Sequence, residues 1–378
     1  MEKLKILIVA DVLGEKNNGT TITITRLIDG LEKLGWEVLV VSPQAVDKKN
    51  YYVLKKRNFF VFNNYVQKNG VVLAVPDKIL LTNLIKKVDI VHIALPFKTG
   101  KMALKICKKL GVPVTAGFHC PAEAFTAHIG LKNFKLLNYL IYRRYYNQFY
   151  KKIDVVHCPT KLLAESLKKK GYKNNFAIIS NGVSNNFVSN KKAKPHQLKD
   201  KFCILYVGRL SNEKRHKLLV DAVSKSKYNK KIQLIFAGDG PLKQKLIKQS
   251  KKLFNQPIIK FMSGEELNNM YNMCDLYVHC SDIETEGISC LEAICCNLVP
   301  LISDSARSAT KEFALTKDNL FQAGSVISLK NKIEFFIENM QRLNYLKNLY
   351  KNYGDNFKIE LCIEKMDKMF KDEIKKSV

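Results

Sequence analysis

Two glutamates eight residues apart are the strongest candidates for binding a ligand. Glu284 and Glu292 lie in the stretch Ser281–Ala293, where Gly287 precedes an apolar helical pattern. This order places Glu284 on a loop and Glu292 in the following helix, with the first backbone N–H groups of that helix between them. Carboxylates accept hydrogen bonds from sugar hydroxyls, and helix-start N–H groups bind phosphate oxygens. Together they could hold a sugar, a diphosphate and a ribose, although an isolated glutamate is more often a solvated charge.

Two cations follow an apolar run that is typical of a buried strand. Arg209 and Lys214 come directly after Phe202–Gly208, where a loop at the carboxyl end of a strand would lie. A planar guanidinium and a point-charge ammonium can together neutralise a diphosphate. A second strand-end turn, Gly238–Pro241, reads Gly-Asp-Gly-Pro, and its proline would begin a helix. Each signal is weak alone, and the chain has neither a P-loop nor a G-x-G-x-x-G after a strand.

The elements that must carry these residues alternate between strands and helices. Apolar runs typical of buried parallel strands lie at 4–10, 37–41, 71–75, 90–93, 112–116, 155–157, 202–208, 232–237, 258–261, 276–279 and 298–302. Amphipathic helical patterns separate them, the first at about 20–34, and a strongly charged helical pattern covers 340–378. This alternation predicts an α/β protein with doubly wound parallel sheets.

A polar segment divides the two series of strands. Residues 183–201 are rich in lysine and asparagine and indicate a linker. We therefore expect one Rossmann-like domain at 1–183 and a second at 184–354, with a helix at 355–378 packing back on the first. Ligands of such sheets bind beyond the carboxyl ends of the strands, so a cleft between the two domains is the expected site. Both glutamates should then face a polar cleft, and their removal should leave no buried partner unsatisfied.

The composition of the 378 residues limits the possible partners. An apolar fraction of 46% excludes wholesale disorder. Lysine and arginine (63) exceed aspartate and glutamate (34) to give a net charge of +29, of which residues 1–190 carry +18. Such a surface attracts nucleic acid or an anionic bilayer, unless the excess only reflects a lysine-rich genome. The ten cysteines form neither a C-x-x-C pair nor a zinc-ligand cluster, which favours a reducing cytoplasm, and we see no secretory or membrane-spanning segment.

Taken in order, the motifs of the second half resemble those of glycosyltransferase family 4, which has the GT-B fold of two Rossmann-like domains facing a cleft. The family carries a Gly-Arg-Leu-x-x-Glu-Lys loop, a Gly-Asp-Gly-Pro turn and two glutamates separated by seven residues. The resemblance implies that Arg209 and Lys214 hold the donor diphosphate, Glu292 the nucleotide ribose and Glu284 the transferred sugar. It further implies that sugar and phosphate meet the backbone of Gly287, Ile288 and Ser289. Glu286, where the family often has phenylalanine, and Arg215, where glycine or asparagine often follows the lysine, depart from the pattern.

The first half extends the resemblance over roughly residues 5–370. His119, in Ala116–Glu123, matches a histidine that lies beside the donor sugar in the family, whereas we interpret His157 as structural. Gly19, in Asn17–Thr21, matches a loop that approaches the donor phosphate or the acceptor. Further segments, including Tyr277–Cys280 and Ser308–Thr310, are most similar to the bacterial lipid-modifying branch that contains cholesterol α-glucosyltransferases and diacylglycerol glucosyltransferases.

This resemblance implies a retaining transfer from a nucleotide sugar, which we expect to be UDP-glucose. No carboxylate beside His119 is a clear covalent nucleophile, because Glu123 is four residues away. A front-face displacement is therefore expected, in which the leaving diphosphate takes the acceptor proton while Arg209 and Lys214 stabilise its charge. The chain has no Asp-x-Asp sequence, so we expect neither a metal clamp nor any other cofactor.

A basic and aromatic segment is the candidate for docking on a membrane. Residues 132–152 hold six basic residues, seven aromatic residues and no acidic one. Phe134, Leu137, Ile141 and Tyr145 recur at helical spacing and could enter the headgroup region. The basic residues that would contact anionic lipid are Lys132, Lys135, Arg143 and Arg144. The alternative is an ordinary helix of the first domain with its aromatic residues in the core.

Three functions are compatible with the sequence. The first is glucosylation of a lipid hydroxyl, of a sterol or of diacylglycerol, by an enzyme that docks on the inner face of the cell membrane without spanning it. The second keeps the enzyme but makes the acceptor a capsule, lipopolysaccharide or other glycan. The third is a basic nucleic-acid-binding protein, for which no base-reading helix or stacking motif is recognisable. The sequence does not indicate an oligomeric state.

Overall fold

The computed structural model describes residues 3–11, 13, 19–44, 49–56, 73–127, 134–190 and 192–377. The chain divides into two compact units, Met1–Gly182 with Ile359–Val378 and Val183–Lys358. The first unit ends at Gly182, one residue before the expected boundary after residue 183. The chain re-enters the first unit after Lys358, whereas the expected boundary was after residue 354. Residues 354–358 stay with the second unit because the Val183 N–H donates to the Phe357 carbonyl over 2.7 Å, and the Phe357 ring packs edge-on against Phe313.

The first unit is built on a parallel sheet of seven strands in its described residues. The strands are β1 (Lys5–Val9), β2 (Glu37–Ser42), β3 (Tyr51–Val53), β4 (Ile90–Ile93), β5 (Val114–Gly117), β6 (Val155–Cys158) and β7 (Asn175–Ile178). Their order is β3-β2-β1-β4-β5-β6-β7, so the chain starts in the middle and winds outwards in both directions. The apolar runs predicted β1, β2, β4, β5 and β6, but β3 and β7 are half-exposed edge strands without such a run. Of the strand predicted at 71–75, residues 71 and 72 lie outside the described residues, and Ala74 forms only an isolated bridge with Lys56.

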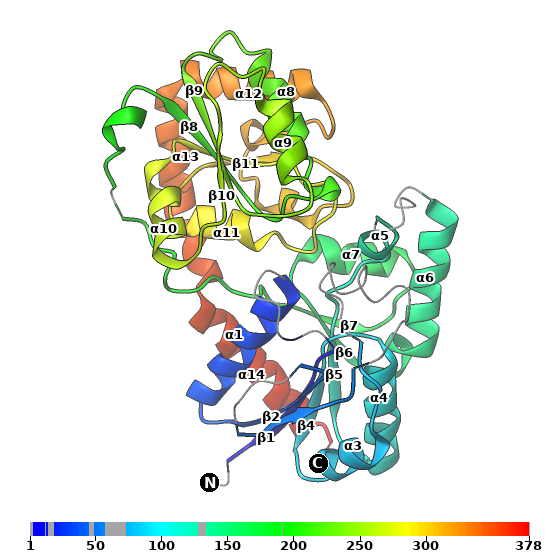
Figure 1. The fold of residues 1–378 in the computed structure, drawn as a ribbon. Helices are drawn as coiled ribbons and strands as arrows, with labels where there is room; N and C mark the ends of the chain where they lie inside the picture. Colours follow the sequence, from blue (N-terminus) through cyan, green and yellow to red (C-terminus); the bar gives the residue numbers. More distant parts are fainter. Residues whose placement is uncertain are drawn as a thin grey trace. The chain divides into compact units, whose positions relative to one another are not determined.

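Helices cover both faces of this sheet. They are α1 (Gly19–Lys33), α3 (Lys78–Ile85), α4 (Lys98–Leu110), α5 (Ala122–Ala127), α6 (Lys135–Gln148), α7 (Lys161–Lys169) and α14 (Ile359–Lys375). Because strand side chains alternate, Leu7 packs into the apolar layer of α3, α4 and α7, whereas Ile8 packs into that of α1 and α14. Helix α14 lies beside α1 (Figure 1), and the Trp36 indole N–H donates to Asp367 of α14 over 2.7 Å.

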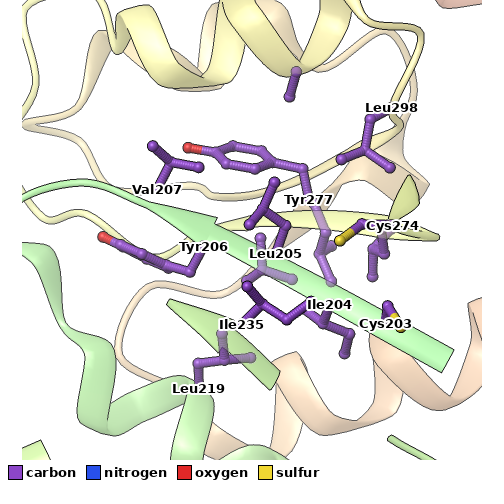
Figure 2. Packing of buried hydrophobic residues seen from close by; sticks show 14 of the residues in the cluster. Cys203, Ile204, Leu205, Tyr206, Val207, Leu219, Ile235, Cys274, Tyr277 and Leu298 are labelled. Carbon is purple, nitrogen blue, oxygen red and sulfur yellow. The ribbon is translucent and has the colours of Figure 1, made fainter. Parts of the chain in front are cut away.

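The second unit repeats the same plan with a parallel sheet of six strands. They are β8 (Phe202–Val207), β9 (Ile232–Ala237), β10 (Ile258–Lys260), β11 (Leu276–His279), β12 (Pro300–Ser303) and β13 (Leu320–Phe321), in the order β10-β9-β8-β11-β12-β13. The helices are α8 (His216–Ser224), α9 (Lys243–Ser250), α10 (Gly264–Met273), α11 (Ile288–Cys295), α12 (Val326–Glu338) and α13 (Met340–Tyr353). Tyr206 of β8 and Tyr277 of β11 leave the sheet on opposite faces (Figure 2). The chain order reverses between β8 and β11, and this switch point is where doubly wound sheets bind ligands.

The charged pattern at 340–378 forms two helices. Helix α13 belongs to the second unit and α14 to the first, and the short 3₁₀ turn Gly354–Phe357 separates them. A side chain at Gly354 would approach the backbone of Cys295 to 3.2 Å, so the chain packs closely on α11 at this turn. No helix in the described residues is both long and apolar enough to cross a bilayer.

Candidate active site

The loops that follow β8 and β11 bring two of the predicted site residues together. Lys214, seven residues after the end of β8, forms an ion pair with Glu284, five residues after the end of β11. Their side chains are 19% and 15% exposed. The pair lies at the switch point of the second sheet, at the carboxyl ends of the strands, where the sequence predicted the site.

Glycines of the Gly-Asp-Gly-Pro turn hold the β8 loop in place. A side chain at Gly238 would come within 2.0 Å of the Gly208 carbonyl oxygen, and one at Gly240 within 2.7 Å of the Leu210 nitrogen. The Leu210 N–H donates to the Asp239 carbonyl over 2.9 Å, so the two loops are in direct contact. This turn therefore supports the loop that carries Arg209 and Lys214. The backbone of Lys214 is also held by the Tyr206 hydroxyl, which donates to the Lys214 carbonyl over 2.8 Å.

The structure shows how an arginine is accommodated at position 215, where it departs from the family pattern. Its φ of 57° is left-handed, a conformation that glycine and asparagine adopt more readily than arginine. The arginine gains an ion pair instead, because its Nε donates to Asp282 Oδ2 over 2.8 Å. The Asp282 N–H donates to the Glu213 carbonyl over 2.8 Å. Both contacts join the β8 loop to the β11 loop.

The β11 loop leads into helix α11 through a turn that requires glycine. Gly287 has a φ of 90°, and a side chain there would come within 2.4 Å of Thr310 Oγ1. Helix α11 then begins at Ile288, so the N–H groups of Ile288 and Ser289 belong to its first turn and have no acceptor within the helix. Both residues are half-buried. The predicted loop-to-helix arrangement of the two glutamates is therefore present.

The two glutamates have more partners than the sequence suggested. Glu284 pairs with Lys214, and Glu292, which is 8% exposed, lies 3.2 Å from the Tyr271 hydroxyl. The same hydroxyl donates to the Ser289 carbonyl over 2.9 Å. The expectation that truncation would leave no buried partner unsatisfied was therefore wrong, because the glutamates are packed against Lys214 and Tyr271.

Charge interactions keep Glu284 ionised. Burial alone would raise the pKa of this carboxyl, but the Lys214 ammonium and a hydrogen bond from His279 outweigh burial and hold the pKa well below its ordinary value. Burial lowers the pKa of His279, although Glu284 acts in the opposite direction, so the ring is neutral at neutral pH. The ionised Glu284 can therefore accept hydrogen bonds from sugar hydroxyls.

The sequence did not identify His279, Tyr277 and Thr310 as parts of the site. His279 Nε2 lies 3.4 Å from Glu284 Oε1, and its Nδ1 lies 2.9 Å from the Tyr277 hydroxyl. Tyr277 in turn lies 3.0 Å from Ser289 Oγ. The available signal was the two-residue spacing of Tyr277 and His279, which places both on one face of a strand that would otherwise be apolar.

The first unit holds the remaining predicted residues, Gly19 and His119. Gly19 begins α1 and is exposed, while the loop residues 14–18 before it lie outside the described residues. His119 follows β5 and lines a cavity with His92, His157 and Ser180. Burial and the neighbouring His157 lower the pKa of His119 to about 3, so its ring is neutral.

The exposed face of α6 differs from the predicted one. Ile141 and Tyr145 pack against the core, contrary to the expected membrane-facing stripe. The exposed apolar residues on and beside α6 are Phe134 (55%), Leu136 (60%), Tyr139 (51%) and Leu140 (49%). Lys135, Arg143 and Arg144 are exposed as well, whereas Lys132 lies outside the described residues. The helix is therefore both a core helix and a carrier of an exposed basic and aromatic face.

No group of three or more histidine, cysteine, aspartate or glutamate side chains in the described ranges is arranged to hold a metal ion. The ten cysteines, all of which lie in those ranges, form no disulfide.

Two family models together match most of the chain. Residues 17–187 match the model described as Glycosyltransferase Family 4, and residues 188–356 match the model described as Glycosyl transferases group 1. The α-monoglucosyldiacylglycerol synthase of Acholeplasma laidlawii is 27% identical over 311 residues, which are 75% of this chain and 76% of that protein.

A solved structure that covers nearly the whole chain has the same fold. Anabaena HepE, crystallised in complex with UDP and glucose, is 15% identical and has a TM-score of 0.73, with 98% of this chain and 100% of that chain covered. The catalytic domain of cholesterol-α-glucosyltransferase from Helicobacter pylori is 38% identical over 41% of this chain and 98% of that chain, with a TM-score of 0.40. The predicted GT-B class, with two Rossmann-like domains, is confirmed.

Proposed function

Because the chain belongs to glycosyltransferase family 4, we propose that it transfers glucose from UDP-glucose to a hydroxyl of a membrane lipid, either diacylglycerol or a sterol. The observation that carries the donor half of this proposal is the Lys214–Glu284 pair at the switch point, next to the first turn of α11. The printed activity of the Acholeplasma relative, which is named for a glucosyldiacylglycerol, supports the lipid half.

The second unit offers partners for the glucose, the ribose and the diphosphate of the proposed donor. The ionised Glu284 would accept hydrogen bonds from glucose hydroxyls, and Glu292 would accept them from the ribose. The first N–H groups of α11 would bind phosphate oxygens. Arg209 and Lys214 would neutralise the diphosphate, and the UDP and glucose bound to HepE support a donor of this kind.

The proposed reaction retains the configuration of the sugar. The bond between the anomeric carbon and the phosphate oxygen breaks while the acceptor oxygen attacks from the same face, and the leaving diphosphate takes the acceptor proton. Arg209 and Lys214 stabilise the negative charge that grows on the diphosphate. His119 is neutral, so we assign it a hydrogen bond that positions the sugar rather than the donation of a proton. We propose that no metal ion is required, because the chain has no Asp-x-Asp sequence.

We further propose that α6 docks the enzyme on the inner face of the cell membrane. Its exposed face combines Leu136, Tyr139 and Leu140 with Arg143 and Arg144. Aromatic rings favour the headgroup zone, and each cation near an anionic surface adds about 1 kcal/mol. Such docking would place the enzyme at its lipid acceptor as a peripheral protein.

The acceptor is tested by thin-layer chromatography of products made from labelled UDP-glucose. Parallel reactions receive detergent-dispersed diacylglycerol, detergent-dispersed sterol or a soluble glycan. We expect a labelled glycolipid in one of the first two reactions. Labelled glycan with no labelled lipid would overturn the lipid acceptor in favour of a cell-surface glycan, and no transfer from UDP-glucose to any acceptor would overturn the donor.

Docking is tested with vesicles rich in anionic lipid. Replacing Lys135, Arg143 and Arg144 with serine should reduce both co-sedimentation and lipid glucosylation, while hydrolysis of UDP-glucose is retained. A matched control removes three exposed lysines from α1 and from the end of α3, namely Lys33, Lys86 and Lys87. If both triple variants lose vesicle binding equally, total charge rather than α6 determines docking.

A further inference from the structure

A buried chain of polar side chains runs behind the proposed donor site. His279 is 1% exposed, and its Nδ1 lies 2.9 Å from the Tyr277 hydroxyl, which lies 3.0 Å from Ser289 Oγ. On the other side of the ring, Nε2 lies 3.4 Å from Glu284 Oε1 and 3.5 Å from Thr310 Oγ1. This hydrogen-bond chain therefore joins Glu284 to Ser289, two residues on separate sides of the Gly287 turn.

The neighbours of the ring decide which nitrogen carries the proton. The Thr310 hydroxyl donates to the Glu286 carbonyl over 2.9 Å, so its oxygen can only accept at His279. The ionised Glu284 also can only accept. With the proton on Nε2 both acceptors are satisfied, whereas a proton on Nδ1 would turn the Nε2 lone pair toward two acceptors in a buried site. The contacts therefore require a proton on Nε2, and because burial lowers the pKa of the ring and keeps it neutral, Nδ1 carries none.

This tautomer fixes the direction of every other bond in the chain. Nδ1 then carries a lone pair, so the Tyr277 hydroxyl must donate to it. The Tyr277 oxygen accordingly accepts the Ser289 hydroxyl proton. Ser289 has no hydroxyl proton left for a phosphate oxygen, and its side chain can offer a ligand only lone pairs, while its backbone N–H in the first turn of α11 stays available.

We propose that His279 and Tyr277 are positioning residues that fix a one-way hydrogen-bond chain from Ser289 to Glu284. The chain holds the Glu284 carboxylate in place and presents the Ser289 hydroxyl as an acceptor, which selects a ligand hydroxyl rather than a phosphate at that point. The proposal rests on the proposed function only in assigning Glu284 and Ser289 to the donor, since the direction of the chain follows from the protein alone.

Nitrogen NMR of the full-length protein with ¹⁵N-labelled histidine rings tests the direction without any substrate. Long-range ¹H–¹⁵N correlations distinguish the two tautomers, and the spectrum of His279→Gln assigns the signal among the seven histidines. We expect a neutral Nε2–H ring in the wild type, and the same tautomer in Tyr277→Phe, because Glu284 and Thr310 still accept at Nε2 in that variant. A wild-type proton on Nδ1 or a charged ring at neutral pH would overturn the proposal, whatever the donor is.

Kinetics test the positioning role. Tyr277→Phe and His279→Gln should each lower kcat/KM for the nucleotide sugar by about three- to tenfold, the effect of losing one or two hydrogen bonds. Tyr350→Phe is the matched control, because Tyr350 is fully buried in the same unit and its hydroxyl donates to the Phe313 carbonyl over 2.9 Å, outside this chain. Unchanged kcat and KM in both test variants would refute a positioning role. If the wild type shows no turnover of UDP-glucose, the proposed function fails, and the tautomer measurement still decides the inference.

Discussion

Breaking the Lys214–Glu284 ion pair should destabilise the second unit. The two side chains are only 19% and 15% exposed, so neither charge is well solvated after its partner is removed. Glu284→Gln keeps the size of the side chain but leaves the Lys214 ammonium facing a neutral amide. A hydrogen bond to a charged group contributes about 1.5–3 kcal/mol to the free energy of unfolding. Each kcal/mol shifts the Tm of a domain of this size by about 2–4 °C. We therefore expect the Tm of Glu284→Gln to be lower than that of the wild type by about 3–12 °C.

A double-mutant cycle with Lys214→Met isolates the pair from other effects of the substitution. Thermal unfolding of both single variants and the double variant should give a coupling free energy of at least about 1 kcal/mol. The exposed pair Lys358–Asp355, at 61% and 62%, is the matched control and should give about 0.5 kcal/mol or less. A coupling for Lys214 and Glu284 no larger than that of the control would refute the argument that burial makes this pair strong.

The same pair predicts the sign of a pH effect. The folded pKa of Glu284 is held below its ordinary value of 4.5, so the stabilisation is fully present above pH 4.5 and is lost as the pH falls below it. The difference in Tm between wild type and Glu284→Gln should therefore shrink in acid. A difference that stays constant or grows below pH 4.5 would show that the loss in the variant does not come from the ionised carboxylate.

Three further outcomes are expected. Gly287→Ala should unfold the start of α11 and abolish transfer, because its Cβ would lie 2.4 Å from Thr310 Oγ1 at a φ of 90°; circular dichroism and activity check this, and an active, equally stable variant would contradict it. The first unit should lose stability as the pH falls below about 6.5, because burial lowers the pKa values of His119, His92 and His157 and the folded state therefore resists their protonation. Asp11, whose pKa burial raises to about 6, acts in the opposite direction, but it is one group against three. A melting series from pH 8 to 5 that shows no decrease in Tm would contradict this. Arg209→Ala should lower kcat by about a hundredfold while UDP binding measured by calorimetry weakens less, and transfer should survive EDTA; loss of activity in EDTA that Mg²⁺ restores would contradict the proposed charge stabilisation.

Local patterns were sufficient for most of the fold. The strands Ile232–Ala237 and Leu276–His279 coincide with the predicted runs, because a strand buried on both faces is almost continuously apolar. The motifs predicted glycosyltransferase family 4 and the GT-B fold, and both predictions are confirmed. The edge strands β3 and β7 were not predicted, because a half-exposed strand needs no apolar run and its pairing depends on a neighbour far away in the sequence.

The sequence alone supplied the candidate residues of the proposed donor site, including Arg209, Lys214 and the two glutamates, because each lies in a short motif. Only the tertiary structure decided that Lys214 and Glu284 are partners and that His279 contacts Glu284. These contacts depend on β8 and β11 being neighbours in the sheet, although β9 and β10 separate them along the chain. Likewise, helical spacing predicted α6, but its exposed face was decided by which side chains the core had room to bury. Spacing along a chain reports local geometry, whereas partners and exposure are properties of the packed molecule.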